Sequence, residues 1–161
     1  MSATTSRHSS AASTRRHSSR TAARASLVPF ALTMVGLTVV QHAIIAATGS
    51  RIGLFAALST AAIALVYAGY LLRFARPLAQ VRFGLLAVHA LVFAVVNTGF
   101  HLHAFILVAS GSPAIAGSPH APLGAGWFGA TLGMAAFWGL GLGCHALGAI
   151  ASRGFESGAR A

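Results

Sequence analysis

The hydrophobic residues of this chain gather into four long runs separated by short polar connections. The runs cover approximately residues 26–48, 52–74, 83–110 and 125–151. A helix needs about 20 apolar residues to cross a hydrocarbon core of about 30 Å, and each run is long enough. A signal peptide has a shorter apolar region, of about 7–15 residues, so we expect the first run to be a retained helix. The pattern predicts an all-α integral membrane four-helix bundle that contacts the lipid bilayer.

Polar segments flank the four runs. Residues 1–25 consist, after Met1, of Ser, Thr, Ala, Arg and His alone. Such a segment buries too little apolar surface to offset its ordering entropy, so we expect a disordered Arg/Ser-rich tail. The same composition is typical of an organelle transit peptide, and that alternative stays open. Pro29 is expected in the first turn of the first membrane helix, where its missing N–H costs little. Residues 152–161 form a second short tail.

The charged residues indicate an orientation. All eleven positive charges are Arg, and Glu156 is the one acid. Five Arg lie in the N-terminal tail, three lie between the second and third runs (Arg73, Arg76 and Arg82), and two lie in the C-terminal tail. Only Arg51 lies on the other side. The positive-inside rule therefore predicts a multi-pass protein of the plasma (inner) membrane with both termini cytoplasmic, or facing the matrix or stroma in an organelle. Because the charges lie in tails and connections, no nucleic-acid partner is expected.

Histidines fall into two layers when depth is counted from the ends of the runs. His42 and His103 lie near the outer end, and His89 and His145 lie near the cytoplasmic end, where Tyr67 falls at the same level. Ionisable groups are costly inside a membrane, so they usually face the bundle and have partners there. His89 and His103 are 14 residues apart, which places them near one helix face and about 21 Å apart along the axis.

One interpretation of the layers is b-type haem, which two axial histidines hold from facing helices. His42 would oppose His103, and His145 would oppose His89. The arrangement resembles the stacked two-haem layout of membrane cytochromes b, in which two histidines of one helix are also 13 or 14 residues apart. That resemblance implies four candidate axial ligands. It departs from the cytochromes in one respect, because their facing pair comes from one second helix and here it would come from two.

The other interpretation is structural, with each histidine bonded to a carbonyl, hydroxyl or Tyr of a neighbouring helix. Asn97 and His101, four residues apart, share a face different from that of His89 and are expected to be structural, as is Tyr67. The side chains of His101 and His103 point about 200° apart on a helix, so they cannot share one metal ion, and no metal site is expected.

Several function classes are disfavoured by the lack of carboxylates within the runs. Carboxylate-relayed ion transport and Mg²⁺-dependent phosphoryl transfer would both lack their usual groups. We expect a small non-catalytic integral membrane protein, free-standing, homo-oligomeric or a subunit of a larger membrane complex. The alternatives are a haem or quinone-reacting electron-transfer subunit and a transporter of a small solute or metal. Two Gly-xxx-Gly pairs in the fourth run have the spacing that lets membrane helices approach closely, at Gly129 and Gly133 and at Gly139 and Gly143.

Overall fold

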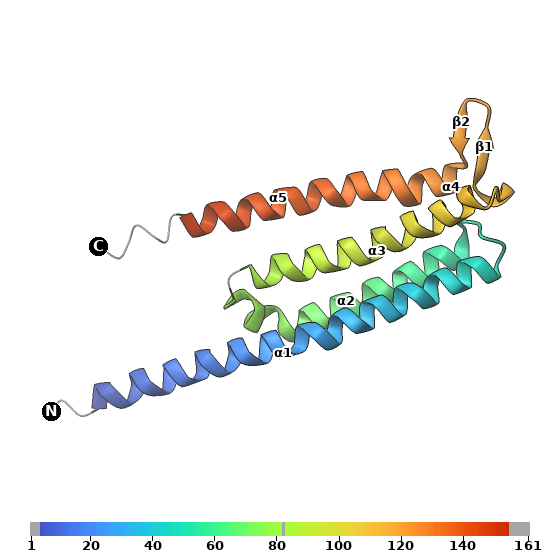
Figure 1. The fold of residues 1–161 in the computed structure, drawn as a ribbon. Helices are drawn as coiled ribbons and strands as arrows, with labels where there is room; N and C mark the ends of the chain where they lie inside the picture. The colour runs from blue at the N-terminus through green and yellow to red at the C-terminus, as the bar shows by residue number, and fades with distance from the viewer. Residues whose placement is uncertain (1–3, 82, 155–161) are drawn as a thin grey trace.

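The computed structural model contains four long helical rods among the described residues, and they lie side by side and alternate in direction (Figure 1). It describes residues 4–81 and 83–154, and side chains from 25 to 151 apart from 82, 121 and 122. The elements, in chain order, are α1 (Thr4–Ala47), α2 (Leu54–Ala79), α3 (Gly84–Ala109), the 3₁₀ helix η1 (Pro113–Ile115), the strands β1 (Ala116–Ser118) and β2 (Ala121–Leu123), α4 (Ala125–Phe128), the π-helix η2 (Gly129–Gly133) and α5 (Met134–Gly154).

Four segments of the described chain are long and apolar enough to cross a membrane. They are Ala25–Ala47, Leu54–Ala79, Gly84–Ala109 and Ala125–Ala151, the last of which combines α4, η2 and α5. The predicted all-α four-helix bundle is therefore confirmed, and the chain is a multi-pass membrane protein. The first and last described residues of the chain lie at one end of the bundle, called the tail end below, and the β1–β2 strand pair lies at the other, called the hairpin end (Figure 1).

Two helix boundaries differ from the sequence-based expectation. The backbone of α1 is helical from Thr4, so Pro29 lies inside the helix rather than in its first turn. The Ala- and Arg-rich segment before it has no Gly or Pro to stop a helix, and its side chains lie outside the described set. Helix α2 was expected to end near residue 74, but it continues to Ala79. The reason is Leu78, which is fully buried, and Arg76 suits the last turn because it faces the negative end of the helix dipole.

Short, tight connections join the rods. At the hairpin end, α1 stops where Gly49 and then Ser50 adopt left-handed backbone angles, and the Ser50 N–H bonds back to the Ile45 carbonyl. At the tail end, Gly84 begins α3 directly against the Leu78 carbonyl. Any side chain at Gly84 would collide with that backbone oxygen, so the turn requires glycine.

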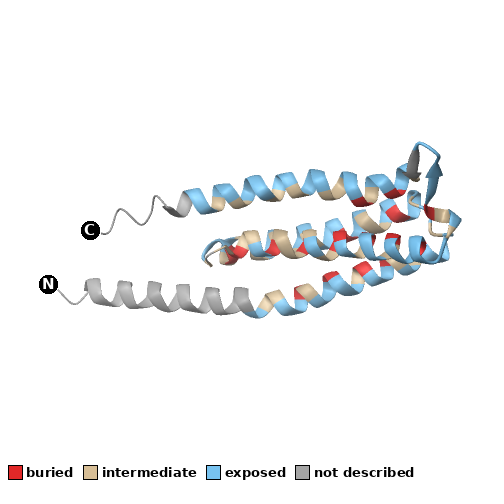
Figure 2. Ribbon diagram, turned by 45° about the horizontal axis from the view of Figure 1, so that its top comes forward, coloured by how far each residue is buried: buried red, intermediate tan, exposed pale blue. Residues whose placement is uncertain are grey.

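Helix α3 occupies the centre of the bundle. It packs against α1, α2 and α5, whereas α5 packs mainly against α3. Its buried face repeats every four residues, at Val88, Val92, Val96, Phe100 and Ala104. Figure 2 shows the contrast between this buried face and the largely exposed surface of α5. In a bilayer lipid covers that apolar surface, so α5 is the rod most fully surrounded by lipid.

The glycine pairs of the fourth rod have unequal roles. A Cβ atom built on Gly139 would lie 3.7 Å from the Phe93 ring of α3, so this glycine lies in the α3–α5 interface. Gly129 and Gly143 have no such neighbour within 4 Å. Close approach of the rods is therefore seen at Gly139, whereas a Cβ atom at Gly133 would meet only the Phe128 carbonyl of its own rod.

Candidate functional site

A pair of histidines joins α1 to α3 near the hairpin end. The Nδ1 atoms of His42 and His103 are 3.1 Å apart, so one imidazole donates a hydrogen bond to the other. The His42 ring also meets the edge of Phe100, with ring centres 4.9 Å apart. The His103 ring lies 5.1 Å from that of Trp127 in α4. The pair expected from depth counting thus lies in direct contact and is held by aromatic neighbours.

Gly99 makes room for this pair. A Cβ atom at Gly99 would lie 2.6 Å from His42 Nε2 and 2.6 Å from the Thr38 methyl carbon. The imidazole of α1 therefore rests against bare backbone of α3. Sequence reasoning missed this residue, although the signal was present: an isolated glycine inside an apolar helix, one turn before His103, usually has a packing reason.

A second group of polar rings lies nearer the tail end. The His89 and His145 rings are 4.7 Å apart and inclined by 41°. The Tyr67 ring meets that of His89 edge-on at 5.8 Å. His89 Nδ1 lies 2.7 Å from the Leu85 carbonyl, and because a carbonyl can only accept, Nδ1 carries the proton. In the neutral ring His89 Nε2 is then left with a lone pair.

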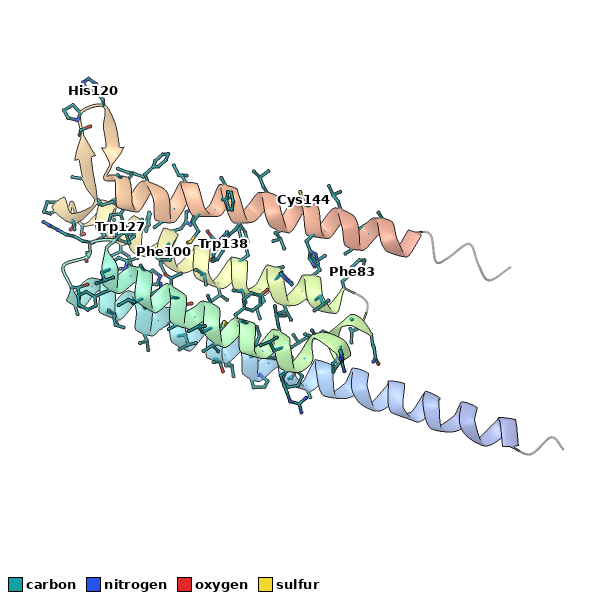
Figure 3. All side chains as sticks on the ribbon, turned by 180° about the vertical axis from the view of Figure 1, so that it is seen from behind. Phe83, Phe100, His120, Trp127, Trp138 and Cys144 are labelled. Atoms are coloured by element: carbon teal, nitrogen blue, oxygen red, sulfur yellow. The ribbon has the colours of Figure 1, made fainter. Side chains whose placement is uncertain are left out.

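These three rings line a cavity of 390 Å³ between α2, α3 and α5. The rest of its wall is mainly aromatic and aliphatic and includes Val92, Phe93, Phe137 and Trp138. Trp138 lies on the side of α5 that faces α3 (Figure 3). Among the described residues the Tyr67 hydroxyl has no hydrogen-bond partner, so it is available to a ligand. An apolar cavity with a few convergent polar groups is the usual form of a small-molecule site, and cavities of this kind lie between the helices of bundles.

Two further polar residues of α3, Asn97 and His101, bond to their own helix. Asn97 Nδ2 donates to the Phe93 carbonyl at 2.8 Å, and His101 Nδ1 donates to the Asn97 carbonyl at 2.8 Å. Asn97 and His101, which were expected to share a helix face, are therefore linked through the Asn97 main-chain carbonyl. Neither bond links two helices, and His101 is exposed.

An apolar layer separates the two histidine groups. Met34 of α1 and Val92 and Val96 of α3 are buried between them and belong to the hydrophobic core. No chain of hydrogen bonds among the described residues crosses this layer. The two groups are therefore two sites, one at each end of the bundle, and a polar solute finds no continuous polar path between them in this conformation.

The candidate axial ligands can be tested against the dimensions of haem. Two imidazole nitrogens on opposite sides of one metal ion are about 4 Å apart, because each metal–nitrogen bond is about 2.0–2.1 Å. The His42–His103 nitrogens are 3.1 Å apart and bonded to each other, and the His89 and His145 ring centres are only 4.7 Å apart. This conformation leaves no slot for a macrocycle between either pair. No cluster of three or more His, Cys, Asp or Glu residues that could hold a metal ion occurs among the described residues.

The aromatic wall of the α2–α3–α5 cavity was not foreseen. Its sequence signal was the four-residue spacing of Phe137, Gly141 and His145, which places a ring, a gap and an imidazole on one face of α5.

Comparison with known proteins adds no precedent for either site. No family model matches this chain, no curated protein is significantly similar to it, and no solved structure matches it.

Proposed function

We propose that this multi-pass membrane protein binds the ring head group of a quinone-class lipid in the cavity between α2, α3 and α5. The observation that carries the proposal is the convergence of Tyr67, His89 and His145, from three different helices, on one apolar and aromatic cavity. The protein would act as a binding protein, either alone or as a small subunit of a larger membrane complex.

The polar groups suit both redox forms of such a head group. A quinone presents two carbonyl oxygens that accept hydrogen bonds, and the Tyr67 hydroxyl is a donor. A quinol presents hydroxyl groups that donate, and His89 Nε2 is an acceptor because Nδ1–H is bonded to the Leu85 carbonyl. The flat ring can stack on Phe93 and Trp138 of the wall.

The bilayer gives the ligand its route of entry. Phe137, which lines the cavity, is 79% exposed on the lipid-facing surface of α5. A ligand dissolved in the membrane can therefore enter sideways, and its isoprenoid tail can stay among the lipid chains. The Arg distribution supports placing the tail end, and with it this cavity, on the cytoplasmic side of a plasma (inner) membrane.

The test is equilibrium binding of decylubiquinone to the purified full-length protein in lipid nanodiscs. We expect saturable binding that weakens about tenfold in His89→Gln and in Tyr67→Phe, the effect of losing about one hydrogen bond from a desolvated site. His101→Gln is the matched control, since His101 lies on the same helix and makes the same bond to a carbonyl one turn earlier, but outside the cavity. Equal affinity for wild type, His89→Gln and Tyr67→Phe would reject the proposal.

A b-type haem is the alternative occupant of the same cavity. His89 has one feature of an axial ligand, because metal-bound histidines commonly donate their other N–H to a backbone carbonyl. His145 would have to move away from His89 to admit the macrocycle. A reduced-minus-oxidised absorption spectrum of protein expressed with haem supplied decides between the two, since a Soret band that His89→Ala removes would replace quinone by haem.

A further inference from the structure

A second cavity lies between α1 and α3, near the hairpin end and across the apolar layer from the first. It has a volume of 370 Å³, and its wall includes Thr38, Val39, His42, Gly99, Leu102 and Ile106. Two polar atoms of this wall are buried without a hydrogen-bond partner, Thr38 Oγ1 and His42 Nε2. The Thr38 side chain is only 5% exposed, so bulk water does not satisfy its hydroxyl.

Thr38 has no hydrogen-bond partner for its hydroxyl, whereas four other threonines bond to their own helix. The hydroxyls of Thr33, Thr48, Thr60 and Thr131 each donate to a carbonyl one turn earlier on the same helix. That bond satisfies a hydroxyl without any help from a neighbour. The Thr38 hydroxyl makes no such bond although the residue lines the cavity, so its donor and its lone pairs are unused within the protein.

The tautomer of His42 follows from its surroundings. In the Nδ1–Nδ1 bond one ring must donate. If His42 donates, its buried Nε2 carries a lone pair. If His103 donates, the neutral His42 ring has a buried Nε2–H with no acceptor. Orphaned buried donors are rarer than under-satisfied acceptors, so the first arrangement is favoured. The cavity then presents one donor, Thr38 O–H, and one acceptor, His42 Nε2.

Thr38 and His42 lie one turn apart on α1 and both line the cavity, so the donor and the acceptor belong to the same face of that helix. His42 Nε2 and the Thr38 methyl carbon flank the same point above the Gly99 Cα, each 2.6 Å from where a Cβ would lie. We propose that this cavity binds the hydroxyl head group of a membrane lipid alcohol. The hydroxyl donates to His42 Nε2 and accepts from Thr38 Oγ1, whereas a ketone or ester oxygen could only accept. The apolar body of the lipid lies along Val39, Leu102 and Ile106, which are exposed toward the bilayer.

Histidine NMR on the full-length protein tests this site. The ¹⁵N-histidine-labelled protein is placed in phosphatidylcholine nanodiscs, and cholesterol or 1,2-dioleoylglycerol is added in separate titrations. The His42 Nε2 resonance, assigned by its loss in His42→Asn, should move saturably toward the hydrogen-bonded value with one of the two lipids. Which lipid acts distinguishes a rigid sterol from a flexible acylglycerol as the source of the alcohol.

The variants use matched controls from the same helix or of the same type. Thr38→Val removes the hydroxyl at nearly constant shape and should weaken the response about tenfold, while Gly99→Ala fills the space and should abolish it. Thr33→Val and Gly36→Ala, both outside the cavity, should leave it unchanged. Unchanged Nδ1 resonances of His42 and His103 would show that Thr38→Val retains the fold. The proposal is overturned if neither cholesterol nor 1,2-dioleoylglycerol gives a saturable shift, or if Thr38→Val responds as strongly as the wild type. It is also overturned if the His42 Nε2 resonance is already at the hydrogen-bonded value before either of these two lipids is added, which would mean a bound water.

Discussion

At Gly99 a missing side chain determines how α1 meets α3. A glycine inside a helix costs roughly 0.5–1 kcal/mol relative to alanine, so alanine would be favoured here if helix propensity alone decided. The close approach of His42 and Thr38 leaves no room for a methyl group. The close packing of α1 against α3 at this point therefore requires glycine.

The first prediction concerns the stability of this interface. Gly99→Ala should lower the free energy of unfolding by about 1–3 kcal/mol, the usual cost of overpacking, and should break the His42–His103 hydrogen bond. Gly143→Ala is the control, because a Cβ at Gly143 has no neighbour within 4 Å and gains helix propensity. Unfolding in mixed micelles measures both. If Gly99→Ala leaves the free energy of unfolding unchanged, α1 does not approach α3 this closely.

A buried amide supplies the second prediction. Gln41 Nε2 donates to Thr60 Oγ1 of α2 at 2.6 Å. Thr60→Val would leave this amide buried without its acceptor, whereas Gln41→Leu removes the polar group itself, so Thr60→Val should be the more destabilising change. A double-mutant cycle should give a coupling free energy of about 0.6 kcal/mol, the average for such bonds in membranes. Strictly additive effects would contradict the bond.

The sequence predicts well how deep a side chain lies in the membrane, but it predicts poorly how each helix is rotated about its own axis. Counting residues from the ends of the hydrophobic runs places His42 level with His103 and His89 level with His145, because every helical residue adds the same rise. Whether two level side chains face one another depends on how each helix is turned about its axis. That rotation is set by many small packing contacts, such as His42 against Gly99, and it cannot be predicted from any single residue.

At the scale of the helices, α5 is attached less extensively than the other rods. Its main contact is α3, but its N-terminal extension α4 is tied to the α1–α2 turn by a hydrogen bond from Trp127 Nε1 to the Ser50 carbonyl, 3.0 Å long. Trp127 is buried. The cavity proposed for a quinone lies farther along α5, and we expect the anchoring at the hairpin end to limit how far α5 can move from α2 beside that cavity.

The third prediction tests the tie. Trp127→Phe keeps an aromatic ring but removes the N–H, so α5 should sample a wider range of positions relative to α2. The native Cys144 is exposed on α5 (Figure 3), and with Leu72→Cys on the exposed surface of α2 it allows a spin-label distance measurement. We expect a broader distance distribution in Trp127→Phe and an unchanged one in Trp138→Phe. Identical distributions in all three proteins would exclude an anchoring role for Trp127.

Helix ends illustrate what local sequence can and cannot predict. Arg73, Arg76 and Pro77 resemble a connection, yet all three lie within α2. The long Arg side chains can extend toward the membrane surface from within a helix, and burial of Leu78 against the bundle favours one further turn. Tertiary packing therefore extended a helix that local signals would have ended.

On the scale of the whole molecule, the bundle has a ligand-sized cavity near each end and a hydrophobic core between them. The core residues Met34, Val92 and Val96 keep the two cavities apart. The two proposals are therefore independent, because a variant in the α1–α3 cavity should leave decylubiquinone binding unchanged, and a variant of His89 should leave the His42 resonance unchanged.

The fourth prediction concerns the orientation of the whole bundle. Ten of the eleven Arg residues lie, by sequence, in the two tails and in or beside the α2–α3 connection, and Arg51 lies in the α1–α2 connection. In a bacterial host, a reporter active only in the periplasm should be silent when fused after Gly154 and active when inserted at Gly117 in the hairpin. Activity after Gly154 would reverse the orientation and place the quinone cavity on the outer side.

The same reporters can show whether the Arg residues cause this orientation. Replacing Arg73 and Arg76 with Gln leaves helix propensity nearly unchanged but removes two charges beside the connection. Because the five Arg of the N-terminal tail remain, we expect the orientation to persist in this variant and to become mixed only when those tail residues are also replaced. A fixed orientation after both sets of changes would mean that hydrophobic length or the uncharged hairpin, rather than charge, directs insertion.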